Sequence, residues 1–349
     1  MGTSAAEPTE RRKRKPWRLI FRAAMLLATG VSIYLLAPSL VDLFSSWPDL
    51  KHLEPLWLLL AVLFEATSYL SLWTVQRIAL RTSSWFVVGT AQLAGGAAGS
   101  IIPGGAASAG AISYGMLVRA GVPAADVAAG LTATTLATTT MVFALPALAL
   151  PEILGGIPAP HRLLQTAYIG GGAFVLAVVA GVAAFLWDKP LLAVGRAVDR
   201  GLRLLRRQPH DTGARLLEQR DAIRRSFGSR WPVALCGVVG KPGFDYLALV
   251  ACLAAVGARP SPSLVLLAYA AGALLALIPF TPGGLGFVEA GLTGLLALAG
   301  ASAHQAVVAT LAYRLISFWL PMPIGGVAYL LFRRRYGAPV GGSASTTSP

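Results

Sequence analysis

Long apolar stretches separated by polar or charged segments recur along the chain. A helix needs about 20 predominantly apolar residues to cross the hydrocarbon core of a bilayer. Six stretches near or above that length cover residues 20–38, 55–75, 124–148, 165–187, 231–256 and 304–332. The pattern predicts an all-α polytopic membrane protein with about six full spans.

Two further apolar stretches, residues 85–118 and 264–299, are each interrupted by a helix-breaking run. The runs are Pro103-Gly104-Gly105 and Pro282-Gly283-Gly284. Because proline and glycine both disfavour a helix interior, each stretch predicts a helix, an unwound turn and a second helix. Unwound backbone survives in a bilayer only where protein or a watery cavity satisfies it. We therefore predict two broken, re-entrant elements.

The two breaks lie 179 positions apart, and this spacing also relates identical residues beyond them. The matched pairs are Ala111 and Ala290, Leu117 and Leu296, Gly121 and Gly300, Ala124 and Ala303, and Leu136 and Leu315. We interpret the matches as an internal repeat; the alternative is chance agreement in so apolar a chain. Broken helices at corresponding places in two halves are typical of transporters with a substrate site near the midplane.

Composition and charge agree with a membrane protein. The 349 residues are 55% hydrophobic and 13% charged, with a mean hydropathy of +0.65, which excludes a soluble globule. The net charge of +14 is concentrated outside the apolar stretches: seven basic residues between positions 11 and 22, eleven within 188–230, and Arg333 to Arg335. The positive-inside rule places these clusters and both termini in the cytoplasm. We expect a plasma membrane protein that binds no nucleic acid.

If both broken elements re-enter the membrane, the second copy of the repeat is inverted relative to the first. Inverted repeats are the arrangement that many alternating-access transporters use.

The domain organisation is simple. Residues 1–16 and 337–349 are predicted to be disordered tails around a single transmembrane domain, 17–336. Within it, residues 188–230 interleave apolar and basic positions, which fits either a basic helix on the cytoplasmic membrane surface or a solvated linker. About forty residues cannot form a catalytic domain, so we do not expect an enzyme.

Metal sites, disulfides and cofactors are not expected. Cys236 and Cys252 lie in one predicted span, about 24 Å apart at 1.5 Å per residue. The four histidines show no ligand spacing; they are His52, His161, His210 and His304.

Five ionisable residues fall inside predicted spans, where charges are expensive and mark functional candidates. They are Glu65, Lys241, Asp245, Glu289 and Arg314. Lys241 and Asp245 are one helical turn apart and form either a structural ion pair or, because Pro242 and Gly243 loosen the helix, a mobile coupling pair. Glu65 is either a third coupling residue or a hydrogen-bond partner for a neighbouring helix.

Glu289 and Arg314 form the second candidate pair. Glu289 follows the second break, at the start of a half-helix whose free amides and positive dipole end can hold an anion. Arg314 lies deep in the last span and needs a carboxylate or phosphate partner. Either the two form a structural lock, or an anionic head group exchanges with Glu289 on Arg314. The candidate substrate-binding residues are Pro103, Gly104, Gly105, Pro282, Gly283, Gly284, Gly286, Glu289 and Arg314.

Two segments carry a family resemblance: residues 278–291, IPFTPGGLGFVEAG, and residues 312–319, AYRLISFW. They resemble the signature of the flippase-like family that includes the transmembrane region of lysylphosphatidylglycerol synthases and UPF0104-type membrane proteins of bacteria and archaea. The likeness extends over about residues 20–332. It implies a multi-span fold with re-entrant helices that moves a lipid or lipid-linked molecule between leaflets, and it supports roles for the second break, Glu289 and Arg314.

The chain departs from that family in two respects. Relatives often carry an acidic residue and an arginine after the first break, whereas residues 104–118 contain no charge. No segment resembles the soluble aminoacyl-transfer domain of the synthases, so lipid aminoacylation by this chain alone is not expected.

The sequence thus favours a transporter of an anionic lipid or polyprenyl-linked molecule. One alternative is a non-catalytic scaffold for an envelope glycosyltransferase or lipid-modifying enzyme that docks on residues 188–230. Another is an ion-coupled carrier of a soluble anion. The sequence leaves open whether the protein forms a homo-oligomer.

Overall fold

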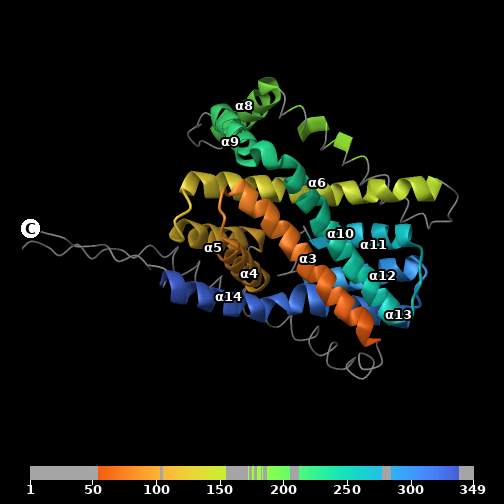
Figure 1. Cartoon of the computed structure of the whole chain (residues 1–349). Helices are drawn as coiled ribbons and strands as arrows, with labels where there is room; N and C mark the ends of the chain where they lie inside the picture. The colour runs from red at the N-terminus through yellow and green to blue at the C-terminus, as the bar shows by residue number, and fades with distance from the viewer. Residues whose placement is uncertain are drawn as a thin grey trace, which may run out of the picture.

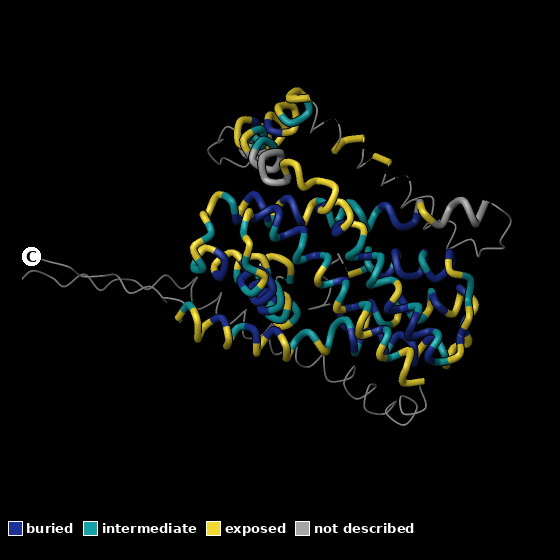
Figure 2. The backbone as a smooth tube through the Cα atoms, viewed as in Figure 1, coloured by how far each residue is buried: buried dark blue, intermediate teal, exposed yellow. Residues whose placement is uncertain are grey.

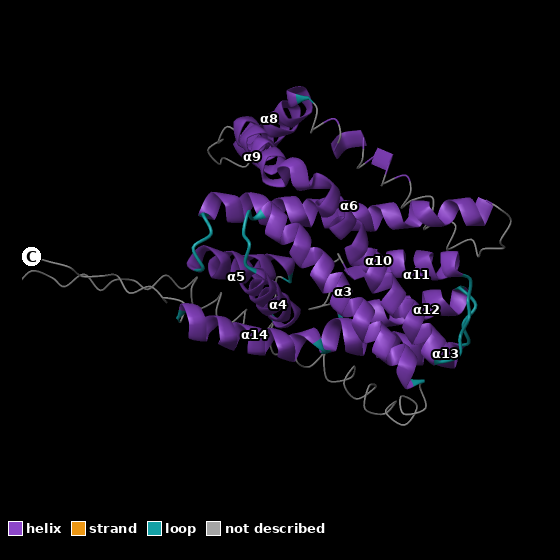
Figure 3. Ribbon diagram, viewed as in Figure 1, coloured by secondary structure: helices purple, strands orange, loops and turns teal. Residues whose placement is uncertain are grey.

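The computed structural model describes residues 54–102, 105–154, 187–204, 212–276 and 284–337, together with a few positions between 172 and 183. These residues fold into helices joined by short connections (Figures 1 and 3). The predicted all-α class is confirmed for them.

Four helical stretches of the described chain are long and apolar enough to cross a membrane: Pro55–Ala79, Ala124–Pro146, Gly228–Ala255 and Ala303–Tyr336. They confirm four of the six predicted spans. The span predicted at 20–38 lies outside the described residues, and the one at 165–187 lies largely outside them.

The first three of these stretches correspond to helices α3 (Pro55–Ala79), α6 (Ala124–Leu154) and α10 (Trp231–Ala255). The last stretch consists of α13 (Ala303–Arg314), a π-helical turn (Leu315–Trp319) and α14 (Pro321–Tyr336). The π turn stands just before Pro321, where the amide of Leu320 bonds back to the carbonyl of Leu315 at 2.8 Å. Such turns often lie at functional sites.

The first broken element is a hairpin of α4 (Trp85–Ile101) and α5 (Ala106–Arg119). Glycines allow the two helices to touch, because a Cβ on Gly99 would lie 2.8 Å from the Cβ of Ala109. The Ser113 hydroxyl donates to the Ala91 carbonyl at 3.0 Å. The predicted interruption is confirmed by its flanking helices, although Pro103 and Gly104 are outside the described residues.

The second broken element is a similar hairpin of α11 (Pro262–Ala276) and α12 (Phe287–Leu298). Gly272 faces Leu292, and Gly291 faces Leu275. Of the predicted break, Pro282 and Gly283 lie outside the described residues. Gly284 and Gly286 adopt the left-handed backbone that glycine permits, with φ of +72° and +77°.

Backbone conformation repeats at the spacing found in the sequence. Gly105 and Gly284 both have positive φ, and so do Gly121 and Gly300, at +92° and +106°. Helices α5 and α12 end 179 positions apart, and α6 and α13 begin 179 positions apart. These matches support the internal repeat, while its inversion across a membrane stays a prediction.

The core has two parts, visible as the buried stretches of Figure 2. One apolar cluster joins α10, α11, α12 and α13 around Leu253, Leu292 and Leu296. The other joins α4, α5 and α14 around Leu117 and Phe332. Helix α3 packs against α10 along much of its length (Figure 1).

Residues 188–230 contain α8 (Asp188–Leu204) and α9 (Thr212–Phe227), which pack against each other above α6 in Figure 1. Arg220 of α9 forms an ion pair with Asp188 of α8 at 2.5 Å. The apolar side chains of Val194 and Val198 are exposed on α8. The segment is therefore helical where it is described, and its position at a membrane surface stays a prediction.

A charged cavity and a neighbouring groove

Both predicted ion pairs lie at one cavity of about 320 Å³, which we call the charged cavity. Lys241, Asp245 and Arg314 line it, together with residues of α6, α11 and α12. The cavity is lined from five helices between α6 and α13, so residues 69 positions apart in sequence, such as Asp245 and Arg314, meet only in the fold.

Asp245 is the most heavily bonded group at the cavity. Its carboxylate accepts hydrogen bonds from the hydroxyls of Tyr313 at 2.7 Å and Tyr269 at 3.0 Å. The Lys241 ammonium lies 3.4 Å from the same carboxylate. Three donors satisfy a buried carboxylate that would otherwise be costly. The predicted pairing of Lys241 and Asp245 is confirmed, and a coupling role for it stays a prediction.

Lys241 also links α10 to α3. Its ammonium donates to the Ser68 hydroxyl at 2.8 Å and lies 5.4 Å from the centre of the Tyr69 ring. The Ser68 hydroxyl in turn donates to the carbonyl of Lys241 at 2.9 Å. That carbonyl and Pro242 belong to an unbroken helix, so the proline does not interrupt α10.

Arg314 and Glu289 form the second ion pair, with Nε and Oε1 2.7 Å apart. The side chains are 10% and 14% exposed, so water screens the attraction little. The guanidinium carbon lies 4.1 Å from the centre of the Phe318 ring. Glu289 stands in the first turn of α12, as predicted. The pairing is confirmed, whereas exchange with a head group stays a prediction.

Glu65 joins the Lys241 and Asp245 cluster rather than standing alone in its span. Its side chain is within hydrogen-bonding reach of the Asp245 carboxyl, and the residue is only 5% exposed. Its Oε2 atom has no hydrogen-bond partner among the described residues. Glu65 thus lies beside Asp245 of α10, and both roles considered for it, coupling and bonding to a neighbouring helix, stay predictions.

The breaks are less central to the charged cavity than the sequence suggested. Val288 and Leu292 of α12 line it, and Gly284 lies against Val288. Gly105 of the first break is not among its lining residues. Substrate contact by either turn stays a prediction.

Sequence reasoning missed Tyr269. It is the one hydroxyl-bearing aromatic in the apolar helix α11, and it reaches Asp245 from there. A lone tyrosine in a buried apolar helix usually needs a partner for its hydroxyl, which is the signal that could have identified it.

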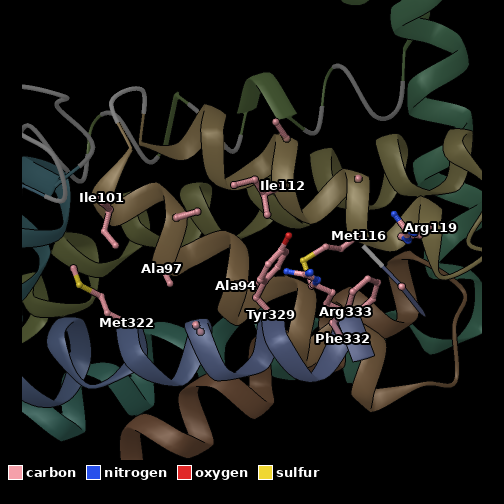
Figure 4. A pocket seen from close by; sticks show the side chains of 16 residues that line it. Ala94, Ala97, Ile101, Ile112, Met116, Arg119, Met322, Tyr329, Phe332 and Arg333 are labelled. Carbon is pink, nitrogen blue, oxygen red and sulfur yellow. The ribbon is translucent and has the colours of Figure 1, made fainter. Parts of the chain in front are cut away.

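A larger apolar groove of about 710 Å³ runs between α4, α5 and α14 (Figure 4). Small residues such as Ala97 and Gly325 line it beside Met116 and Phe332. Ile101 and Met322 lie toward one end, and Arg119 and Arg333 lie toward the other (Figure 4). Sequence reasoning missed this groove because its walls come from three separate helices.

A small pocket of about 210 Å³ adjoins the groove. Ala97 and Met322 line both this pocket and the groove. Tyr69 and Phe318 also line it, and these two rings contact Lys241 and Arg314 of the charged cavity. The groove and the pocket thus adjoin each other, and the rings of Tyr69 and Phe318 stand between the pocket and the charged groups of the cavity.

Curated relatives match part of the chain. A UPF0104 membrane protein of Methanothermobacter thermautotrophicus is 33% identical over 97 residues, which are 28% of each protein. A UPF0104 membrane protein of Pyrococcus horikoshii is 35% identical over 92 residues, 26% of this chain and 28% of that protein. The match thus spans little more than a quarter of these relatives' length.

One protein family matches far more of the chain. The lysylphosphatidylglycerol synthase transmembrane region matches residues 24–325, which include every helix of the charged cavity and most of the groove. This protein therefore belongs to the family of the lysylphosphatidylglycerol synthase transmembrane region.

Proposed function

We propose that this protein is a flippase that moves an anionic lipid or a polyprenyl-linked anionic molecule between the leaflets of the cytoplasmic membrane. One observation carries the proposal: an apolar groove adjoins a small pocket, and the rings of Tyr69 and Phe318 separate that pocket from the charged groups of the cavity. A lipid needs both environments at once, because its head group requires charge and its tails require an apolar surface.

The proposed cycle uses the residues that line these spaces. A head group phosphate exchanges with Glu289 for the guanidinium of Arg314, which suits bidentate phosphate binding. The chains stay in the groove or in the surrounding lipid while the head group passes Tyr69 and Phe318. Lys241 and Asp245 keep the cavity walls in place through Ser68.

A lipid-exchange assay with the purified protein in phosphatidylcholine vesicles tests this proposal. We expect acyl-labelled fluorescent phosphatidylglycerol to move between leaflets, and a membrane-impermeant quencher measures the exchanged fraction. Labelled phosphatidylcholine is the control for head-group selectivity. Equal rates in protein-containing and empty vesicles would refute the flippase proposal, and uptake of soluble phosphate by the same vesicles would favour the soluble-anion carrier.

Narrowing the groove gives a second expected result. Gly326 lines the groove, and a Cβ there would meet nothing within 4 Å. Gly326→Leu should therefore fold normally but slow lipid exchange about tenfold, because its side chain occupies the space of an acyl chain. Gly110→Leu, on the open side of α5, is the matched control. An unchanged exchange rate in Gly326→Leu would argue against the groove as the lipid path.

A scaffold role is the alternative, favoured by the exposed apolar and basic surface of α8. Replacing Arg196 and Arg200 with glutamine should leave lipid exchange unchanged if the protein is a flippase. Loss of an envelope enzyme from the purified complex in that variant, with no lipid exchange by the wild type, would support the scaffold instead.

A further inference from the structure

The charged cluster beside the cavity contains more carboxyl groups than cations. Among the described residues at this site, Lys241 and Arg314 carry positive charge, and each is already paired, with Asp245 and Glu289 respectively. Glu65 is a third carboxyl with no cation of its own. A buried cluster with an unpaired carboxylate is costly, and a bound proton removes that cost.

The contacts of Glu65 indicate where the proton lies. Two carboxyl groups form a hydrogen bond with each other only if one of them is protonated. Asp245 already accepts from Tyr269, Tyr313 and Lys241, and all three of those bonds favour its charged form. The proton therefore belongs to Glu65, which donates it to Asp245.

The surroundings of the second carboxyl oxygen of Glu65 are those expected for a neutral acid. Its Oε2 is buried and has no hydrogen-bond partner in the described part of the chain. The Oε2 of Glu289 is also buried without a partner, but the Oε1 of Glu289 is paired with Arg314 at 2.7 Å. Glu65 has no such ion pair among the described residues, so an ionised Glu65 would lose its solvation without compensation, whereas a neutral acid loses much less.

Other titratable groups surround this pair on several helices. They are Tyr69 on α3, Lys241, Asp245 and Cys252 on α10, Tyr269 on α11 and Tyr313 on α13. Helices α4 and α6, which also pack against α3, contribute neutral polar groups, among them Gln92 and Thr138. Helix α9 and the π turn pack against α3 as well, and the charged residues of α9, such as Arg215 and Glu218, are not among the groups that act on Glu65. If Glu65 were ionised, no positive group of this cluster would remain to neutralise its charge.

We propose that Glu65 is a proton-binding site that couples transport of the anionic head group to proton binding. This inference rests on the proposed flippase function. With the proton bound, the positive and negative charges around the cavity balance, and an anionic head group meets no surplus negative charge. Release of the proton leaves one uncompensated carboxylate near Asp245 and repels the head group. By linkage, the anion and the proton favour each other's binding.

Infrared spectroscopy tests the proton site without any transport. We expect protein in vesicles at neutral pH to show a protonated-carboxyl band that disappears in Glu65→Gln and persists in the control Glu54→Gln, a change of an exposed acid. The glutamine amide also donates to Asp245, so the melting temperatures should agree. A wild-type spectrum without the Glu65 band would overturn the proposal.

Transport tests the coupling. We expect exchange of labelled phosphatidylglycerol to slow about tenfold as pH rises from the range where Glu65 is protonated to the range where it is not. Glu65→Gln should lose this dependence, while Glu54→Gln keeps it. The same pH dependence in Glu65→Gln and wild type would overturn the coupling. Failure of the wild type to exchange lipid at any pH would overturn the flippase function itself, and the infrared band would still decide the proton site.

Discussion

Arg314→Ala is expected to lower lipid exchange by about 100-fold and to destabilise the protein. Hydrogen bonds to a charged group contribute about 1.5–3 kcal/mol, and each 1.4 kcal/mol is a factor of ten. The substitution also leaves Glu289 buried without its cation, which costs about 3–5 kcal/mol. Vesicle exchange of labelled phosphatidylglycerol and thermal unfolding in detergent measure the two effects.

A double variant separates the structural lock from head-group binding. Arg314→Met with Glu289→Gln removes both charges at similar volume, so its melting temperature should return close to that of the wild type. Lipid exchange should stay at the level of Arg314→Ala, because no guanidinium is present to take the phosphate. Recovery of exchange together with stability would show that the ion pair serves as a structural lock only.

Gly325→Ala is expected to separate α14 from α4. A Cβ at Gly325 would lie 2.3 Å from the carbonyl oxygen of Leu93 and 2.6 Å from the Cβ of Ala97. Because the first of these atoms is backbone, the helices themselves must move apart. Overpacking of this kind costs about 1–3 kcal/mol, which thermal unfolding of the purified protein measures.

The neighbouring glycine is the matched control. A Cβ at Gly326 meets nothing within 4 Å, so Gly326→Ala should leave the melting temperature unchanged or raise it slightly through helix propensity. Equal destabilisation by both alanine substitutions would contradict the close packing of α4 against α14. Since both positions line the groove, a loss of exchange in Gly325→Ala alone would assign the defect to helix separation.

The effects of the Arg314 and Gly325 substitutions are related, because both residues belong to the same stretch of helix. Arg314 and the groove belong to one continuous helical stretch, Ala303–Tyr336, with the π turn between them. Phe318 lies in that turn and touches Arg314, so a shift of α14 reaches the charged cavity directly. We therefore expect part of the effect of Gly325→Ala on lipid exchange to come from a displaced Arg314.

The sequence by itself determined the helices and their interruptions. Apolar length indicated the four spans that the structure describes in full, because a helix satisfies its own backbone and needs no distant partner. Proline and glycine located both breaks, and the spacing of 179 positions reappears in the backbone of Gly105 and Gly284. The i, i+4 spacing of Lys241 and Asp245 likewise indicated their pairing, since one helical turn sets that distance.

Only the tertiary structure decided which of these parts form a site. Tyr269 and Tyr313 reach Asp245 from two other helices, and Glu65 reaches it from a third. The groove depends on how closely Gly325 lets α14 approach α4, which no local pattern encodes. Helix packing brings together residues that are far apart along the chain, and the shape and charge balance of a buried site are properties of that packing.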